Sequence, residues 1–202
     1  MKSRVLLTAL LAIAALPALA RASITTSLVQ IPNIAGEPAT LKTYDVRITT
    51  DQDWTNQKLT LNLTQGTLFQ ETPFGADSQP NPALFAAFPD VQWDTFFTTP
   101  GGYPNVAATG TTPSFATNTQ TATSLDVSWF DSVVTGPGTY TVARITMSSN
   151  AVGAFSGLGF DAQSGGVGTA FSGAITAVPE PGSLVAMSVG SLLLIARKRR
   201  RF

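Results

Sequence analysis

Alternating apolar and polar residues dominate the chain between residues 23 and 176. The clearest alternation and the further strand-length runs fall at residues 41–50, 59–64, 125–129, 140–147, 152–155, 158–160 and 169–175. A period of two places successive side chains on opposite faces of a strand, and many threonines with Gly/Pro turns favour strands over helices. The pattern predicts an all-β body, an antiparallel β-sandwich of about eight to ten strands with one face of each strand toward solvent.

Two stretches interrupt the alternation, at residues 70–89 and 98–118, and both contain several prolines. The first contains Phe74, Leu84, Phe85 and Phe88, so we expect it to pack back on the sandwich with one or two helical turns at residues 83–88. The second is poor in large apolar residues, which predicts a mobile loop.

The N-terminal 22 residues have the order of a secretory signal peptide. Lys2 and Arg4 precede an apolar run at residues 5–16, and small residues follow. We expect cleavage after Ala22, and the second candidate site is after Ala20. The alternative, an N-terminal membrane anchor, is disfavoured because twelve residues are few for a span that needs about 20.

The C-terminal residues 177–202 show the pattern of a second targeting segment. A motif of Val178, Pro179, Glu180 and Pro181 precedes an apolar run at residues 182–196. A basic cluster follows: Arg197, Lys198, Arg199, Arg200 and Arg201. The run covers roughly 22 Å as a helix, short of a hydrocarbon core of about 30 Å, and long basic side chains can make up part of the difference. We expect a single membrane helix at 182–196, with the basic cluster in the cytoplasm and the body outside.

The order of motif, short span and basic cluster resembles the PEP-CTERM sorting signal of Gram-negative bacteria. The resemblance covers only this tail and implies processing at the Pro-Glu-Pro motif by an exosortase, a membrane cysteine protease. It also implies a link to exopolysaccharide or biofilm material. The partners expected from the two ends are the secretion machinery, the membrane and an exosortase. The protein is then tethered to the inner membrane and, after processing, lies at the cell surface or outside the cell.

Composition narrows what the body, residues 23–176, does. It contains four basic and eleven acidic residues, a net charge of −7 that disfavours nucleic acid as a partner. The chain has no histidine and no cysteine, which removes Ser-His-Asp and Cys-His catalysis, disulfides and Cys-ligated metals. We therefore predict a protein that is not an enzyme and binds no cofactor.

Four aromatic residues are the candidates for a sugar-stacking surface on the body: Trp54, Trp93, Tyr103 and Trp129. We interpret Trp93 and Trp129 first as core or sheet-face residues, because aromatic residues fit strands, and a sugar-stacking role requires the rings on an exposed face. Asp51 and Asp53 could supply calcium ligands with another carboxylate, although a solvated turn explains them too, and we predict no metal site.

Three functional hypotheses remain for the body. The first is a non-catalytic envelope or matrix protein, and the second is a carbohydrate-binding module. The third is a hydrolase with two carboxylates about 5 to 9.5 Å apart.

Overall fold

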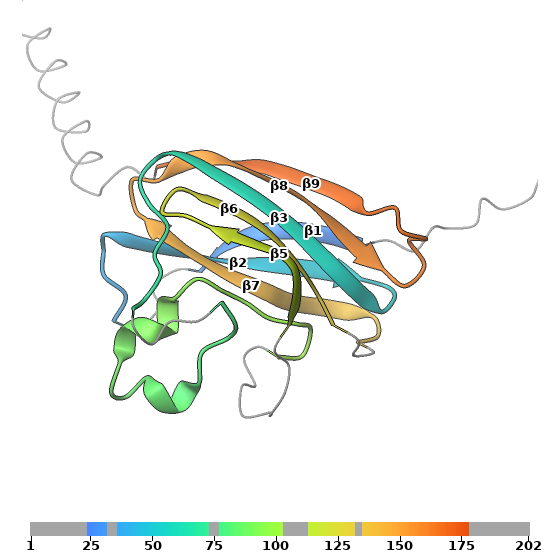
Figure 1. Cartoon of the computed structure of the whole chain (residues 1–202), viewed down its shortest axis with the longest axis horizontal. Coiled ribbons are helices and arrows are strands. Elements are labelled where there is room, and N and C mark those ends of the chain that lie inside the picture. The colour runs from blue at the N-terminus through green and yellow to red at the C-terminus, as the bar shows by residue number, and fades with distance from the viewer. Residues whose placement is uncertain (1–23, 32–35, 73–76, 103–112, 132–134, 178–202) are drawn as a thin grey trace, which may run out of the picture.

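The chain folds into an all-β sandwich of two antiparallel sheets (Figure 1). The computed structural model describes residues 24–31, 36–72, 77–102, 113–131 and 135–177. Within these residues there are nine strands: β1 (Ile24–Ile31), β2 (Leu41–Thr50), β3 (Trp54–Gln65), β4 (Phe96–Phe97), β5 (Ser114–Gln120), β6 (Ser124–Phe130), β7 (Gly138–Ser148), β8 (Val152–Asp161) and β9 (Thr169–Ile175). The predicted fold class and strand number are confirmed.

The strand order explains how one chain builds both sheets. Sheet A has the order β1-β2-β7-β4, and sheet B has the order β5-β6-β3-β8-β9. The turn at residues 51–53 carries the chain from sheet A to sheet B, and the turn at residues 149–151 does the same after β7. Sequence neighbours therefore face each other across the sandwich, as expected for packed sheets that share one core.

The core lies between the sheets and follows the alternation read from the sequence. In sheet B, Leu59 of β3 faces Val127 of β6, and Leu61 faces Leu125. Their side chains are buried, whereas Asp126 between them on β6 is exposed. From sheet A, β2 and β7 contribute apolar side chains to the same core: Val46, Ile48, Val142, Ala143, Ile145 and Met147.

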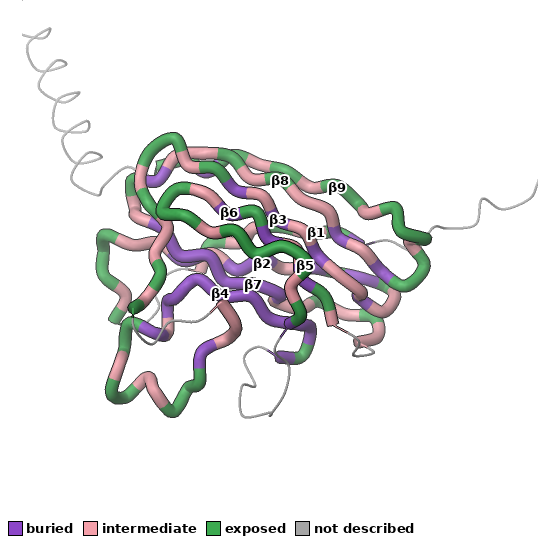
Figure 2. Tube along the Cα trace, in the orientation of Figure 1, coloured by how far each residue is buried: buried purple, intermediate pink, exposed green. Residues whose placement is uncertain are grey.

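The prediction of one solvated face for each strand is wrong for β7. Residues 142–147 of β7 are buried on both faces, and Figure 2 shows this strand as one of the most buried in the fold. The reason is a covering segment, residues 77–102, which contains the 3₁₀ helices η2 (Pro82–Leu84) and η3 (Pro89–Trp93) and the short strand β4. Its η3 helix lies on the outer face of sheet A, where the carbonyl of Gln92 accepts a hydrogen bond from Arg144. Its β4 extends the edge of that sheet beside β7, and the Phe96 ring contacts the guanidinium of Arg144.

The two irregular stretches differ from the expectations in detail. In the first stretch, Leu84, Phe85 and Phe88 are only half-buried, and the buried apolar residues Val91, Trp93 and Phe96 come directly after it. Phe74 lies outside the described residues. Part of the expected loop at 98–118 is strand β5, and β1 was also not foreseen. Both are edge strands. β5 is made largely of polar residues, and β1 places three polar residues in succession, Thr25, Thr26 and Ser27, so neither shows the apolar alternation that identifies a strand.

Substitution of Val127 by Asp tests the sandwich core. Val127 is completely buried, so the variant places an unpaired carboxylate among apolar side chains, and we expect destabilisation by more than about 4 kcal/mol. Ser128→Asp, one residue further along and beside Lys58, is the matched control and should stay folded. Thermal unfolding followed by circular dichroism distinguishes the two, and a Val127→Asp variant as stable as the control would contradict the assignment of β6.

Candidate functional surface

The three candidate tryptophans are interior residues. Trp54, Trp93 and Trp129 are each at most 2% exposed. Trp54 and Trp129 belong to the core between the sheets, where Trp129 packs on Phe97 at a centroid distance of 4.9 Å and its indole N–H donates to the carbonyl of Thr98 at 3.0 Å. The prediction that these rings could form a sugar-stacking surface is therefore wrong for all three. Tyr103, the fourth candidate, lies outside the described residues.

Trp93 is buried in a different layer. It ends helix η3 in the covering segment, and its ring lies 3.4 Å from the position that a Cβ on Gly36 would occupy. Val91, Gln92, Trp93 and Asp94 alternate apolar and polar residues as a strand does, so the pattern could not distinguish this helix from a strand. All three tryptophans fill the interior of the protein.

The turn with Asp51 and Asp53 has a structural role at one end of the sandwich. One carboxylate oxygen of Asp53 accepts hydrogen bonds from the backbone N–H groups of Thr135 and Gly136, at 3.1 and 2.6 Å. The Asp53 carbonyl accepts from the N–H of Ala162 at 2.8 Å. Asp53 thus joins two other turns, and no group of three acidic, His or Cys residues that could hold a metal occurs in the described part of the chain.

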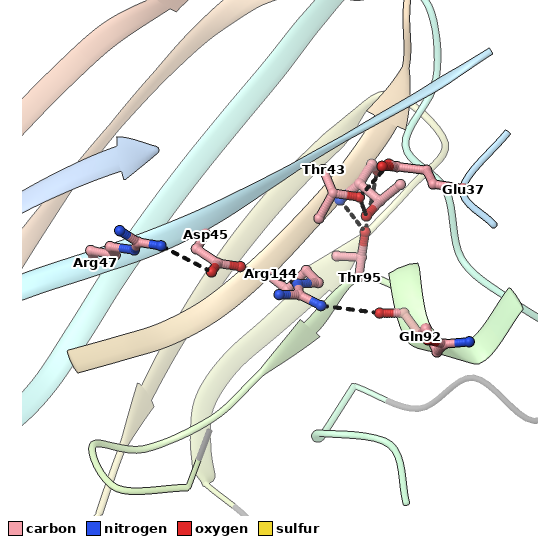
Figure 3. A network of polar contacts seen from close by, with 8 residues as sticks. Glu37, Thr43, Asp45, Arg47, Gln92, Thr95 and Arg144 are labelled. Carbon is pink, nitrogen blue, oxygen red and sulfur yellow. Dashed lines mark hydrogen bonds and ion pairs between the residues drawn. The ribbon is translucent and has the colours of Figure 1, made fainter. Parts of the chain in front are cut away.

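A buried ion pair lies between sheet A and the covering segment (Figure 3). The Nε of Arg144 on β7 donates to the carboxylate of Asp45 on β2 at 3.0 Å, and both side chains are less than 10% exposed. The guanidinium also donates from Nη1 to the carbonyl of Gln92 in η3 at 3.1 Å and lies over the Phe96 ring at 5.7 Å. Arg144 therefore bonds the sheet and its cover together in one place.

A set of hydroxyl contacts continues this junction. The hydroxyls of Thr43 and Thr146 lie 2.7 Å apart across β2 and β7, and Thr43 donates to the carboxylate of Glu37 at 2.6 Å. The Thr95 hydroxyl accepts from the Thr146 N–H at 3.1 Å and donates to the carbonyl of Phe69 at 2.7 Å. Elsewhere on β2, burial lowers the pKa of Lys42 and raises the pKa of Tyr44. The hydrogen bonds among Glu37, Thr43, Thr95 and Thr146 therefore help to hold the covering segment on sheet A.

The outer face of sheet B remains open and is the best candidate for a binding surface. Its side chains form rows across the strands, because in each antiparallel pair a residue lies opposite one residue of the neighbouring strand. One row consists of Thr117, Ser128, Lys58, Leu158 and Ala170, and the next of Thr119, Asp126, Thr60, Ser156 and Ser172. Lys58 and Asp126 form an ion pair at 3.6 Å, so these hydroxyl-rich rows carry no net charge.

Two phenylalanines occupy one end of this face, and sequence reasoning missed both. Phe130 on β6 and Phe160 on β8 flank Asn56 of β3 in a single row. Phe130 is 43% exposed, an unusual state for a large apolar side chain. Adjacent strands lie about 4.8 Å apart, which puts the two Phe backbones roughly 10 Å from each other with an amide between them. The alternation that placed Trp129 inward was the available signal, since it places Phe130 outward.

Arg144→Ala tests whether the buried ion pair holds the cover. The variant leaves Asp45 buried without its closest cation, and we expect a loss of about 3 to 5 kcal/mol in the free energy of unfolding. Lys58→Ala is the matched control because it removes a half-exposed ion pair, which we expect to cost less than about 1 kcal/mol. Urea unfolding measures both, and limited proteolysis should cut the Arg144 variant first within residues 77–102. Equal losses in the two variants would contradict this role.

The outer face of sheet B therefore combines an open row with two aromatic rings, an amide and uncharged hydroxyls, while the outer face of sheet A is partly covered. Within the described residues no helix has the length and apolarity to cross a membrane. Comparison of the chain with models of protein families and with curated proteins gave no match.

Proposed function

We propose that this protein is exported, tethered to the inner membrane by its C-terminal tail, and processed at the Pro-Glu-Pro motif by an exosortase-type protease. Its body then acts as a non-catalytic component of the cell surface or extracellular matrix. The signal peptide at residues 1–22, the motif at 178–181, the span at 182–196 and the basic cluster at 197–201 support this proposal from the sequence, and all of them lie outside the described residues.

One structural observation carries the proposal furthest. The last strand, β9, ends at Ile175, which is buried and pairs with Gly153 of β8. The motif begins three residues later, at Val178. A cut within the motif therefore removes no strand and no core residue that the structure describes. A sorting signal that is removed after export needs such a separation between tail and folded body, because the body must remain intact when the tail is lost.

Replacement of Glu180 by Gln tests the processing step. The change removes the one charge of the motif and leaves its two prolines, so a protease that recognises the motif should cut the variant more slowly. We expect the wild-type protein outside the membrane with a mass ending near Pro179–Pro181, and the variant in the membrane with a mass that includes Phe202. Glu71→Gln, an equivalent change in the body, is the control. Identical masses and locations for wild type and Glu180→Gln would contradict the proposal.

A second candidate function is binding of a neutral carbohydrate on the outer face of sheet B. The observation that favours it is the row of Phe130, Asn56 and Phe160, because sugar rings stack on exposed aromatic faces and their hydroxyls bond to amides. The hydroxyl-rich rows beside it and the absence of net charge on them suit an uncharged polysaccharide better than an ionic one. Exopolysaccharide is the material that the resemblance of the tail implies, and this face would suit one without ionic groups.

Phe130→Ala tests the carbohydrate hypothesis. The variant removes an exposed ring without opening the core, so we expect at least a tenfold weaker affinity for polysaccharide extracted from the producing cells, with little change in stability. Affinity gel electrophoresis measures the difference. Phe85→Ala, which removes a half-buried ring in the covering segment, is the control and should bind like the wild type. Unchanged mobility of Phe130→Ala would exclude this face as the sugar site.

A further inference from the structure

The strands β8 and β9 contain the same four-residue sequence. Ala154-Phe155-Ser156-Gly157 lies in β8, and Ala170-Phe171-Ser172-Gly173 lies in β9. The two copies pair antiparallel around Ser156 and Ser172, which face each other. The register is regular along all seven residue pairs. In this part of sheet B, the chain thus pairs a sequence with its own repeat.

The pairing is selective because each phenylalanine faces a glycine. Phe155 faces Gly173, and Phe171 faces Gly157. A Cβ on either glycine would come within 2.5 Å of the opposite ring, so a larger residue could not replace the glycine without displacing the ring. The two rings also contact each other at a centroid distance of 6.2 Å. An Ala-Phe-Ser-Gly strand is therefore a good antiparallel partner for another strand of the same sequence.

The other edge of β9 has no strand beside it in the described part of the chain, because β9 ends the order of sheet B. Natural edge strands usually avoid pairing with other molecules through charges, prolines, bulges or covering loops. Residues 169–175 contain no charged residue and no proline, and their pairing with β8 shows no bulge. An edge of this kind offers unpaired backbone N–H and C=O groups to a further strand.

The opposite edge of sheet B, strand β5, is protected against pairing with a further strand, unlike β9. β5 has an irregular register between Phe115 and Thr117. Its Asn118 and Gln120 side chains donate to the carboxylate of Asp77 at 2.6 and 2.7 Å, and this places a loop and a charge beside the strand. Of the two edges of this sheet, only β9 combines a regular register with a complete lack of charge.

We propose that β9 pairs with β9 of a second copy of this chain, antiparallel and around a two-fold axis at Ser172. This register places Phe171 opposite the partner's Gly173 and Ala170 opposite the partner's Ala174. The contact joins the two five-stranded sheets into one of ten strands. The strand is uncharged, so the two-fold axis brings no like charges together. The inference rests on the body alone and does not depend on the proposed function of the tail.

The absence of cysteine from the chain permits a direct test with introduced thiols. In full-length protein, Ser172→Cys should form a disulfide-linked dimer under mild oxidation, because residues that face each other in an antiparallel pair have Cβ atoms about 4.5 to 5.5 Å apart. Ala170→Cys alone and Ala174→Cys alone should not, since each would lie about 13 Å from its own copy. An equal mixture of these two variants should form the mixed dimer, which non-reducing electrophoresis and mass spectrometry detect.

Ser156→Cys is the matched control, because it has the same neighbours on the same face but lies one strand inside the edge. A Ser172→Cys protein without dimer, or equal dimer yields at positions 156, 170, 172 and 174, would overturn the proposal. The second case would indicate association through another part of the chain.

A charge placed on the edge provides an independent measurement. Ser172→Lys puts two ammonium groups opposite each other across the axis, so sedimentation analysis should give at least a tenfold weaker dimer than wild type. Ser156→Lys adds the same charge to the same face and should dimerise like wild type. Thermal unfolding of both variants verifies that each is folded. Equal dimerisation of folded Ser172→Lys and wild type would also overturn the proposal.

Discussion

Burial of β7 on both faces is the constraint on which the rest of the structure depends. Its inward side chains complete the core between the sheets, and its outward side chains include Arg144 and Thr146. A buried guanidinium is stable only when its charge and donors are matched, and here Asp45 and the carbonyl of Gln92 match them. The covering segment must therefore lie on sheet A for β7 to be buried, and the ion pair fixes where it lies.

This arrangement makes the two outer faces unequal. The cover buries Thr43, Asp45, Arg144 and Thr146 on the outer face of sheet A. Thr25, Ser27 and Thr49 on the same sheet are exposed, so sheet A is only partly covered and sheet B has the more open outer face. Sheet B has two features that favour contact with another molecule. Phe130, in the row with Asn56 and Phe160, exposes aromatic area, and the edge strand β9 lacks charge. A sheet that binds polymer on its face and its own copy at its edge would suit a protein that builds matrix, because both contacts can be made at once.

The sequence predicted the fold more successfully than the candidate site. Apolar alternation located β2, β3 and β6 because an antiparallel strand with one buried face has a period of two. The same alternation placed Phe130 on the face opposite Trp129, but it could not state whether that outer face was open to solvent or covered by another segment. Composition suggested tryptophans as sugar-stacking rings, but the largest apolar side chains are also the ones that fill a core most effectively.

The sequence pattern did not predict β1 and β5 and divided β8 into two runs, and these errors have physical reasons. The edge strand β5 buries little on either face, and the edge strand β1 contributes only Ile24 and Leu28 to the core, so few alternate positions require an apolar residue. The sequence pattern divides β8 into two short runs because its glycines interrupt the apolar pattern, yet Gly157 leaves room for the Phe171 ring of β9 and Gly153 leaves room for the backbone of β3. Their meaning depends on what lies opposite, which is a property of the register and not of the local sequence.

By itself, the sequence determined the all-β class, the strand periods and the acidic, cysteine-free and histidine-free character of the body, since these follow from local periodicity and composition. Only the tertiary structure decided which sheet is covered, which aromatic rings are exposed and which edge is free. Those properties depend on contacts between residues far apart in the chain, such as Asp45 with Arg144 and Asp77 with Gln120. Local sequence carries the preference for a strand, and the packing of sheets decides what each strand presents to solvent.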